Sequence, residues 1–245
     1  MSILRTRKFH ILAAVVSVSV FISIVVFVNF GKKTDMAETH SAQTNPESFA
    51  FFNLGVDSEL TDTVRDELKE KLGSDAVERW STLDLNINFK GFLQKYFKEL
   101  DEINQRLNNP PGERVEHNII KLRYRYARIK KVPFEYVEFV FSNYTKKPLL
   151  FKISSTKEGA FIVDTIKAKY GEPAVVNWEQ EEGHSLYWQK NKSFLIISIG
   201  KDRYGNPEYH TVIFFVPNIQ ELLFTEQQEA QRREEEIRKK AKTAF

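Results

Sequence analysis

The chain has 245 residues, of which 42% are hydrophobic and 13% aromatic, so it can bury a substantial core. Its 36 basic and 33 acidic residues give a formal net charge of +3, which does not indicate a polyanionic partner for the protein as a whole. The absence of cysteine excludes disulfides, thiolate metal sites and cysteine nucleophiles.

The segment 11–30, ILAAVVSVSVFISIVVFVNF, contains no charged residue. A helix of this length spans about 30 Å, the thickness of the hydrocarbon core of a bilayer. A cleaved signal peptide is one alternative, but its apolar core is only about 7–15 residues long and a small-residue cleavage site follows it. A buried core helix is the other. We expect an uncleaved transmembrane signal-anchor, which makes the lipid bilayer a partner through residues 11–30.

Basic residues flank this segment on both sides. Arg5, Arg7 and Lys8 precede it, and Lys32 and Lys33 follow it. The positive-inside rule then places residues 1–10 in the cytoplasm and the rest outside it, in the periplasm if the source is a Gram-negative bacterium. The difference in charge is small, so the opposite topology stays open.

The remainder divides by composition into three parts. Residues 31–50 are polar and small, with Pro46, and are typical of a linker. Residues 51–224 have the pattern of a globular domain. Residues 225–245 are almost all charged or polar and predict a charged C-terminal helical tail, exposed or docked on a partner.

Helical periodicity occurs in several places along residues 51–245. Leu60, Val64, Leu68 and Leu72 recur at i+4 and predict a helix that Gly73 ends. We expect further helices at 74–80, 92–107 and 158–170, and one from about residue 218 to the end of the chain.

Alternation predicts strands elsewhere. Ile120, Leu122, Tyr124 and Tyr126 alternate with basic residues, and we expect a hairpin around 130–131. Its register would place Leu122 opposite Phe139 and Arg123 opposite Glu138. Further strands are expected at 149–153, 174–178, 186–189, 194–199 and 209–216. The predicted fold class is α+β: helices packed on a mainly antiparallel sheet of about six or seven strands, with a C-terminal charged helix.

No motif for catalysis, a cofactor or a metal emerges. The five histidines lack metal-ligand spacing, and no G-x-G-x-x-G or P-loop occurs. Ser154 and Lys157 match S-x-x-K, but the companion motifs S-D-N and K-T-G are absent, which favours a helix cap. We assign no catalytic, cofactor-binding or metal residue, expect no cofactor, and do not expect an enzyme.

Two sets of residues are candidates for partner binding. Arg123, Tyr124 and Arg125 belong to a basic aromatic stretch that could form a sheet surface for a polyanion. Trp178 and Trp188 fall on neighbouring predicted strands and could line a ligand groove. The competing interpretations are a solvated sheet face for the first set and core packing for the second.

The function expected from these features is a membrane-anchored extracytoplasmic binding or assembly module, with another envelope protein as its partner. One alternative is a membrane-tethered hydrolase with an unrecognised site, which would need groups such as Glu181, His184 and His210 to converge. The other is a cytoplasm-facing polyanion binder, which requires the opposite membrane topology. In the expected topology the domain lies outside the cytoplasm, so we do not expect nucleic acid as a partner.

Overall fold

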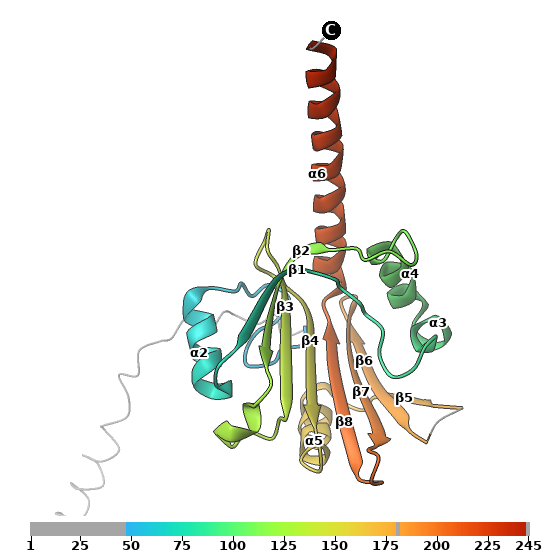
Figure 1. Ribbon diagram of the computed structural model, residues 1–245. Coiled ribbons are helices and arrows are strands. Elements are labelled where there is room, and N and C mark those ends of the chain that lie inside the picture. Colours follow the sequence, from blue (N-terminus) through green and yellow to red (C-terminus); the bar gives the residue numbers. More distant parts are fainter. Residues whose placement is uncertain (1–47, 180–181, 244–245) are drawn as a thin grey trace, which may run out of the picture. The chain divides into compact units, whose positions relative to one another are not determined.

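The computed structural model describes residues 48–179 and 182–243. Within them, eight strands form one antiparallel sheet in the order β1-β2-β3-β4-β8-β7-β6-β5 (Figure 1). The strands are β1 (Ala76–Ser81), β2 (His117–Tyr124), β3 (Tyr136–Ser142), β4 (Pro148–Ser155), β5 (Ala174–Asn177), β6 (His184–Lys190), β7 (Ser193–Lys201) and β8 (Pro207–Phe214).

Helices lie on both faces of this sheet, which confirms the α+β class. Two of them, α2 and α5, pack on one face, and α5 is seen behind the strands in Figure 1. The other face is covered in part by α3, α4 and the first turns of α6. The helices are α2 (Asp62–Leu72), α3 (Phe92–Tyr96), α4 (Lys98–Leu107), α5 (Gly159–Tyr170) and α6 (Val216–Thr243), with a short 3-10 helix η1 (Ala127–Lys130).

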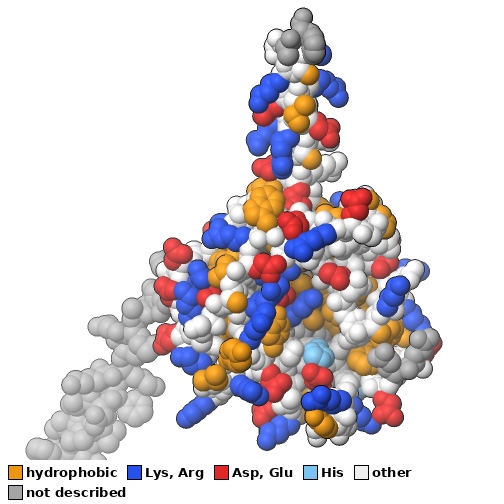
Figure 2. Space-filling view, in the orientation of Figure 1, with side chains coloured by type: hydrophobic (Ala, Val, Ile, Leu, Met, Phe, Trp, Pro, Cys, Tyr) orange, Lys and Arg blue, Asp and Glu red, His pale blue; other side chains and the backbone are white. Residues whose placement is uncertain are grey.

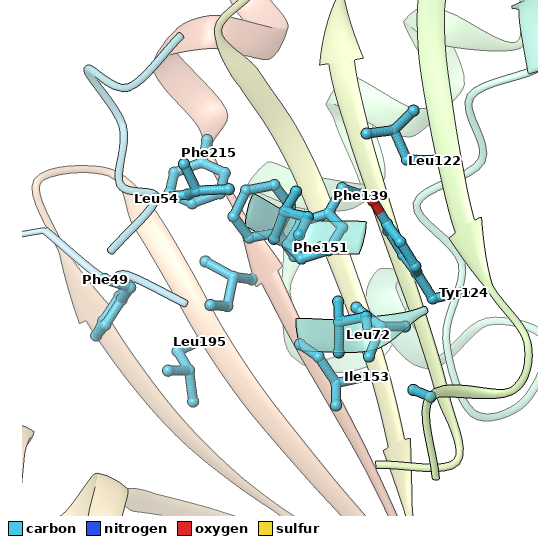
Figure 3. Close-up of a cluster of buried hydrophobic side chains, with 14 of the residues drawn as sticks. Phe49, Leu54, Leu72, Leu122, Tyr124, Phe139, Phe151, Ile153, Leu195 and Phe215 are labelled. Atoms are coloured by element: carbon cyan, nitrogen blue, oxygen red, sulfur yellow. The ribbon is translucent and has the colours of Figure 1, made fainter. Parts of the chain in front are cut away.

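The core beneath α2 and α5 is dominated by aromatic side chains from adjacent strands (Figure 3). The ring of Phe139 lies 4.8 Å from that of Phe151 and 5.9 Å from that of Tyr124, in edge-to-face contacts. Phe151 in turn contacts Phe215, at 5.0 Å between ring centroids. These rings bury the central strands β3 and β4 on the α5 face.

The core on the opposite face covers only part of the sheet. Val140, Leu150 and Phe214 are buried there beneath α4 and α6. Further along the same face, the residues that pair across the strands include Glu138, Lys152 and other polar side chains instead of apolar ones. Strands β3, β4 and β8 therefore change from apolar to polar along this face, while the α5 face stays largely apolar.

The predicted register of the β2–β3 pair is confirmed. Leu122 lies opposite Phe139, and Arg123 lies opposite Glu138. The connection between the two strands is longer than a tight hairpin and contains η1, which ends at Lys131 in the left-handed conformation (φ 58°). The alternation of apolar and charged residues was enough to predict this register, because a shift of one residue would have placed the charged side chains of the two strands in the core.

The helix expected at 74–80 is wrong, because this segment forms strand β1. It pairs with β2 along the edge of the sheet, with Ala76 opposite Arg123 and Glu78 opposite Lys121. A helix of two turns has too few hydrogen bonds to offset its nucleation cost, whereas the open edge of β2 offers partners at once. The sheet therefore has eight strands in the described residues rather than six or seven.

The helix expected at 92–107 is divided into α3 and α4 at Phe97. This residue leaves the helical conformation (φ −139°, ψ 65°). Its ring is held edge-on to Tyr187, at 5.1 Å, and to Phe194, at 6.0 Å. Tertiary aromatic contacts therefore override a pattern that is continuous in the sequence.

The C-terminal helix α6 has two distinct halves. Its first turns bury Val216, Ile219 and Leu222 against the sheet. Residues 230–243 are all exposed, and this part extends away from the sheet in Figure 1. The helix begins two residues before the expected start and runs without a break through the charged segment.

The expected transmembrane segment 11–30 lies outside the described residues. In the part of the chain that the structure does describe, no helix has both the length and the apolar character needed to cross a bilayer.

Candidate functional site

A cavity of about 380 Å³ lies between α5 and the sheet. Its floor is formed by Ile153 of β4, Leu195 of β7 and Ile213 of β8, all of which belong to the core on the α5 face. We call this cavity the α5 pocket. Its remaining lining is Ala50, Phe51, Pro133, Phe134, Glu158, Phe161, Ile162, Thr165, Ile166, Lys169, Tyr170 and Thr211.

The α5 pocket exists because α5 touches the sheet at few points. Only Gly159 and Val163 among its twelve residues are buried. Gly159 packs so closely on Tyr209 that a Cβ there would lie 2.1 Å from the Cγ atom of that ring. Beyond this contact the helix stands off the strands, so Ile162 and Ile166 line a cavity instead of closing the core.

The far wall of the pocket is the segment that enters the domain at residue 48. The backbone N–H of Ala50 donates to the hydroxyl oxygen of Tyr170, at 3.2 Å. The rings of Phe49 and Tyr170 lie 5.1 Å apart, and those of Phe51 and Phe134 lie 5.2 Å apart. Aromatic contacts therefore join the segment at residues 49–51 to Tyr170 and Phe134, and they leave the space between these walls open.

Two ammonium groups lie beside the ring of Tyr170, a residue that lines one end of the pocket. The Nζ atom of Lys169 lies 5.1 Å from the centroid of the Tyr170 ring, and that of Lys190 lies 5.3 Å from it. In the described part of the chain neither lysine forms an ion pair with a carboxylate, and the acidic residue near this end of α5, Glu172, pairs with Lys167 at 3.5 Å. The acidic lining residue Glu158 belongs to the other end of α5. The pocket thus combines an apolar interior with unpaired positive charge at one end.

The opposite face of the sheet carries charged groups that neutralise one another. The guanidinium of Arg123 contacts Glu78 at 2.6 Å through Nη1 and Glu138 at 2.8 Å through Nε. Tyr136 also donates its hydroxyl to Glu138, at 2.8 Å. Figure 2 shows this mixture of positive and negative side chains on the face away from α5.

Burial shapes the ionisation of this network. Burial alone would raise the pKa of the Glu138 carboxyl, but hydrogen bonds from Arg123 and Tyr136, with the charges of Lys152 and Lys121, lower that pKa below its ordinary value. Burial lowers the pKa of Lys121, whose Nζ donates to the carbonyl oxygen of Thr82 at 2.6 Å. These contacts are typical of a structural ion-pair network.

One constellation on this face has the partners of a nucleophilic site. The Oγ atom of Ser154 lies 3.1 Å from Nδ1 of His210, and Nε2 of His210 lies 3.3 Å from a carboxylate oxygen of Glu208. The order of hydroxyl, imidazole and carboxylate matches that of a general-base-activated serine. Ser154 and His210 are also direct cross-strand neighbours, and Glu208 is two residues from His210, so strand pairing alone brings the three together.

The predicted partner-binding residues do not form one surface. Arg123 lies in the ion-pair network, whereas Tyr124 is fully buried on the α5 face and Arg125 is exposed beyond the end of β2. Trp188 is also buried on the α5 face, and its Nε1 donates to the carbonyl oxygen of Gly171 at 2.7 Å. Tyr124 and Trp188 are therefore core residues.

Trp178 lies apart from Trp188, on the opposite face of the sheet. Its Nε1 donates to Oγ of Ser185 at 3.0 Å, and its ring meets Phe89 and Phe92 edge-on. The two tryptophans therefore do not line a common groove.

The histidines are also dispersed. His184 pairs with Ile199 and His210 with Ser198, so the two lie on opposite faces of the sheet, and Glu181 is outside the described residues. His117 is buried near α6. Over the residues with a described position, no three His, Asp or Glu side chains converge as metal ligands.

The α5 pocket is not predicted by the sequence patterns described above. One signal was present, because Phe161, Ile162, Val163 and Ile166 place apolar side chains around more of α5 than a single contact face needs. The structure leaves Phe161 75% exposed at the rim. The other walls come from separate segments of the chain, from residues 50–51 to residue 213, which no local pattern connects.

Comparisons with known proteins add no further assignment: no family model, curated protein or solved structure matches this chain.

Proposed function

We propose that this protein is a membrane-tethered, non-enzymatic binding module whose binding site is the α5 pocket. The observation that carries the proposal is the pocket itself, an apolar cavity of about 380 Å³ beside an otherwise well-packed aromatic core. Ligand sites of proteins are typically concave, mostly apolar and about 300–1,000 Å³ in volume, with few polar groups. The pocket is suited to holding an apolar group of a ligand or partner.

The membrane component of the proposal rests on the sequence. An uncharged stretch at 11–30 has the length of a bilayer span, and the charge before it favours a domain outside the cytoplasm. Such a tether would keep the domain near the bilayer surface, connected to it by the short linker predicted at 31–50. Its ligand would then be a component of the envelope, either a protein side chain or a lipid.

Photolabelling tests this proposal on the full-length chain. The protein is reconstituted in nanodiscs of a zwitterionic phospholipid and exposed to a long-chain alcohol that carries a diazirine near its chain terminus. Labelled peptides are then identified by mass spectrometry. We expect labelling of peptides from α5 and from β4, β7 or β8, which form the roof and floor of the pocket.

Two variants of α5 give a matched comparison. Ile166→Lys places a charge inside the pocket, whereas Ala168→Lys adds the same charge at an exposed position of the same helix. Labelling of the pocket peptides should fall about tenfold or more in the first variant and stay unchanged in the second, since burying an unpaired charge is costly. Equal labelling in both variants, or none in the wild type, would overturn the proposal.

A serine hydrolase is a second candidate, favoured only by the contacts of Ser154 with His210 and of His210 with Glu208. If the site is catalytic, a fluorophosphonate probe should label Ser154 in the full-length chain, and His210→Ala should abolish labelling. The matched control for the loss of a side chain on the same face is Ser198→Ala. The Oγ atom of Ser198 lies 3.2 Å from the Oγ atom of Ser185. Absence of label on Ser154 would end this alternative.

A further inference from the structure

The unpaired positive charge at one end of the α5 pocket restricts what the pocket can hold. Lys169 and Lys190 both place an ammonium group within 5.3 Å of the Tyr170 ring centroid, from α5 and β6 respectively. A neutral hydrocarbon would use the interior of the pocket but would gain nothing from these two charges. An anionic group placed beside the Tyr170 ring would be attracted by both of them.

The size and lining of the pocket restrict the rest of the ligand. A volume of about 380 Å³ is near the lower end of the range of about 300–1,000 Å³ found for ligand sites. It therefore suits one chain better than two. The floor residues Ile153, Leu195 and Ile213 offer only hydrocarbon surface, so the part of the ligand beneath α5 must be apolar.

We propose that the α5 pocket binds a single-chain carboxylate amphiphile, with its hydrocarbon chain beneath α5 and its carboxylate between Lys169 and Lys190. This inference rests on the function proposed above and specifies the class of ligand. The orientation follows from charge, because Glu158 belongs to the other end of α5 and would repel the head group there.

The dipole of α5 opposes this orientation but does not reverse it. The C-terminal end of a helix carries roughly half a negative charge. Here two full positive charges lie beside that end, and the exposed carbonyl of Gly171 already accepts a hydrogen bond from Trp188. The nearby carboxylate of Glu172 is paired with Lys167, so the balance of charge at Tyr170 favours an anion.

Two photoactivatable probes that differ only in the head group test the inference on the full-length chain in zwitterionic nanodiscs. One is a long-chain carboxylate with a diazirine near the chain terminus, and the other is the corresponding alcohol. The measured quantity is the ratio of the labelling of pocket peptides by the two probes at equal content in the nanodiscs. In the wild type, the carboxylate should label these peptides about tenfold more efficiently than the alcohol.

Replacing the two lysines tests the assigned head-group site. In Lys169→Gln/Lys190→Gln the preference for the carboxylate should disappear, while the alcohol still labels the pocket. The matched control, Lys157→Gln/Lys192→Gln, removes two charges at exposed positions outside the pocket lining and should keep the preference. Lys169→Arg/Lys190→Arg should also keep it, which separates loss of charge from a change in packing.

The outcomes separate this inference from the proposed function. Equal labelling by the two probes in the wild type would overturn the inference and leave the proposed function standing. The same holds if the preference survives in Lys169→Gln/Lys190→Gln. If neither probe labels the pocket, the proposed function fails together with the inference.

Discussion

The Nδ1 atom of His117 lies 2.7 Å from Oε2 of Glu226, a contact between β2 and α6 that joins residues 109 positions apart. The Nε2 atom of the same ring lies 2.9 Å from the carbonyl oxygen of Leu107, which can only accept a hydrogen bond. The other carboxylate oxygen of Glu226 accepts from the backbone N–H of Asn118 at 2.9 Å. Glu226 therefore fastens α6 to the sheet at the point where the helix begins to leave it.

Removing this contact should destabilise the domain. Glu226→Ala leaves the buried His117 ring and the Asn118 N–H without their partner, and we expect a loss of about 1–3 kcal/mol in the free energy of unfolding. Glu235→Ala, on the exposed part of the same helix, should cost only a few tenths of a kcal/mol. Chemical unfolding followed by circular dichroism measures both, and equal losses would show that α6 is not fastened by Glu226.

The close contact of Gly159 with Tyr209 predicts a strong effect of a single methyl group. Gly159→Ala places a Cβ 2.1 Å from the ring, so α5 or Tyr209 must move, and we expect a loss of about 1–3 kcal/mol in stability. In Gly200→Ala the nearest atom, in the Trp178 ring, is 3.6 Å away, and this variant should unfold nearly like the wild type. Comparison of their thermal unfolding tests whether α5 is seated as described.

Phe139 is the centre of the aromatic core on the α5 face. Its ring contacts those of Tyr124, Phe141 and Phe151, and it is fully buried. Phe139→Ala should therefore cost about 3–5 kcal/mol. Phe224→Ala, at a position on α6 that is 62% exposed, should change stability by less than about 0.5 kcal/mol. A small effect at Phe139 in urea unfolding would contradict the assigned core.

The ion-pair network predicts a defined dependence of stability on pH. Because the pKa of the Glu138 carboxyl is lowered by folding from its ordinary value of 4.5, its contribution is present above pH 4.5 and is lost as the pH falls through the folded-state pKa. Glu138→Gln lacks this contribution. The difference in stability between wild type and variant should be largest near neutral pH and shrink in acid.

An exposed carboxylate provides the control for that experiment. Glu113→Gln changes the same group at an exposed position and should give a stability that runs parallel to the wild type from pH 7 to acid. A difference between Glu138→Gln and wild type that stays constant as the pH falls would show that the network does not stabilise the ionised carboxylate.

Local pattern predicted those parts of the fold that depend on neighbours in the sequence. The register of Leu122 with Phe139 followed from alternation, because only one phase of the strand buries its apolar side. The segment 74–80 was assigned to a helix because its partner, the open edge of β2, is not visible in its own sequence. The break at Phe97 has the same origin, since its cause is the distant rings of Tyr187 and Phe194.

The candidate site was beyond such patterns for a related reason. The α5 pocket is the space between α5 and three strands. The sequence pattern of each element predicts that element but not the distance between it and its neighbours. Tyr124 and Trp188 were considered for partner binding as aromatic residues, but both are buried in the core instead. The residues that flank the pocket, Lys169 and Lys190, come together at Tyr170 only in the folded chain.

The most direct test of the binding site is an experimental structure of the full-length protein with a bound long-chain carboxylate. We expect density for the hydrocarbon chain between Ile166 of α5 and Leu195 of β7, with the carboxylate next to Lys169 and Lys190. An α5 pocket closed by protein side chains, with the ligand bound elsewhere or absent at saturating concentration, would contradict it.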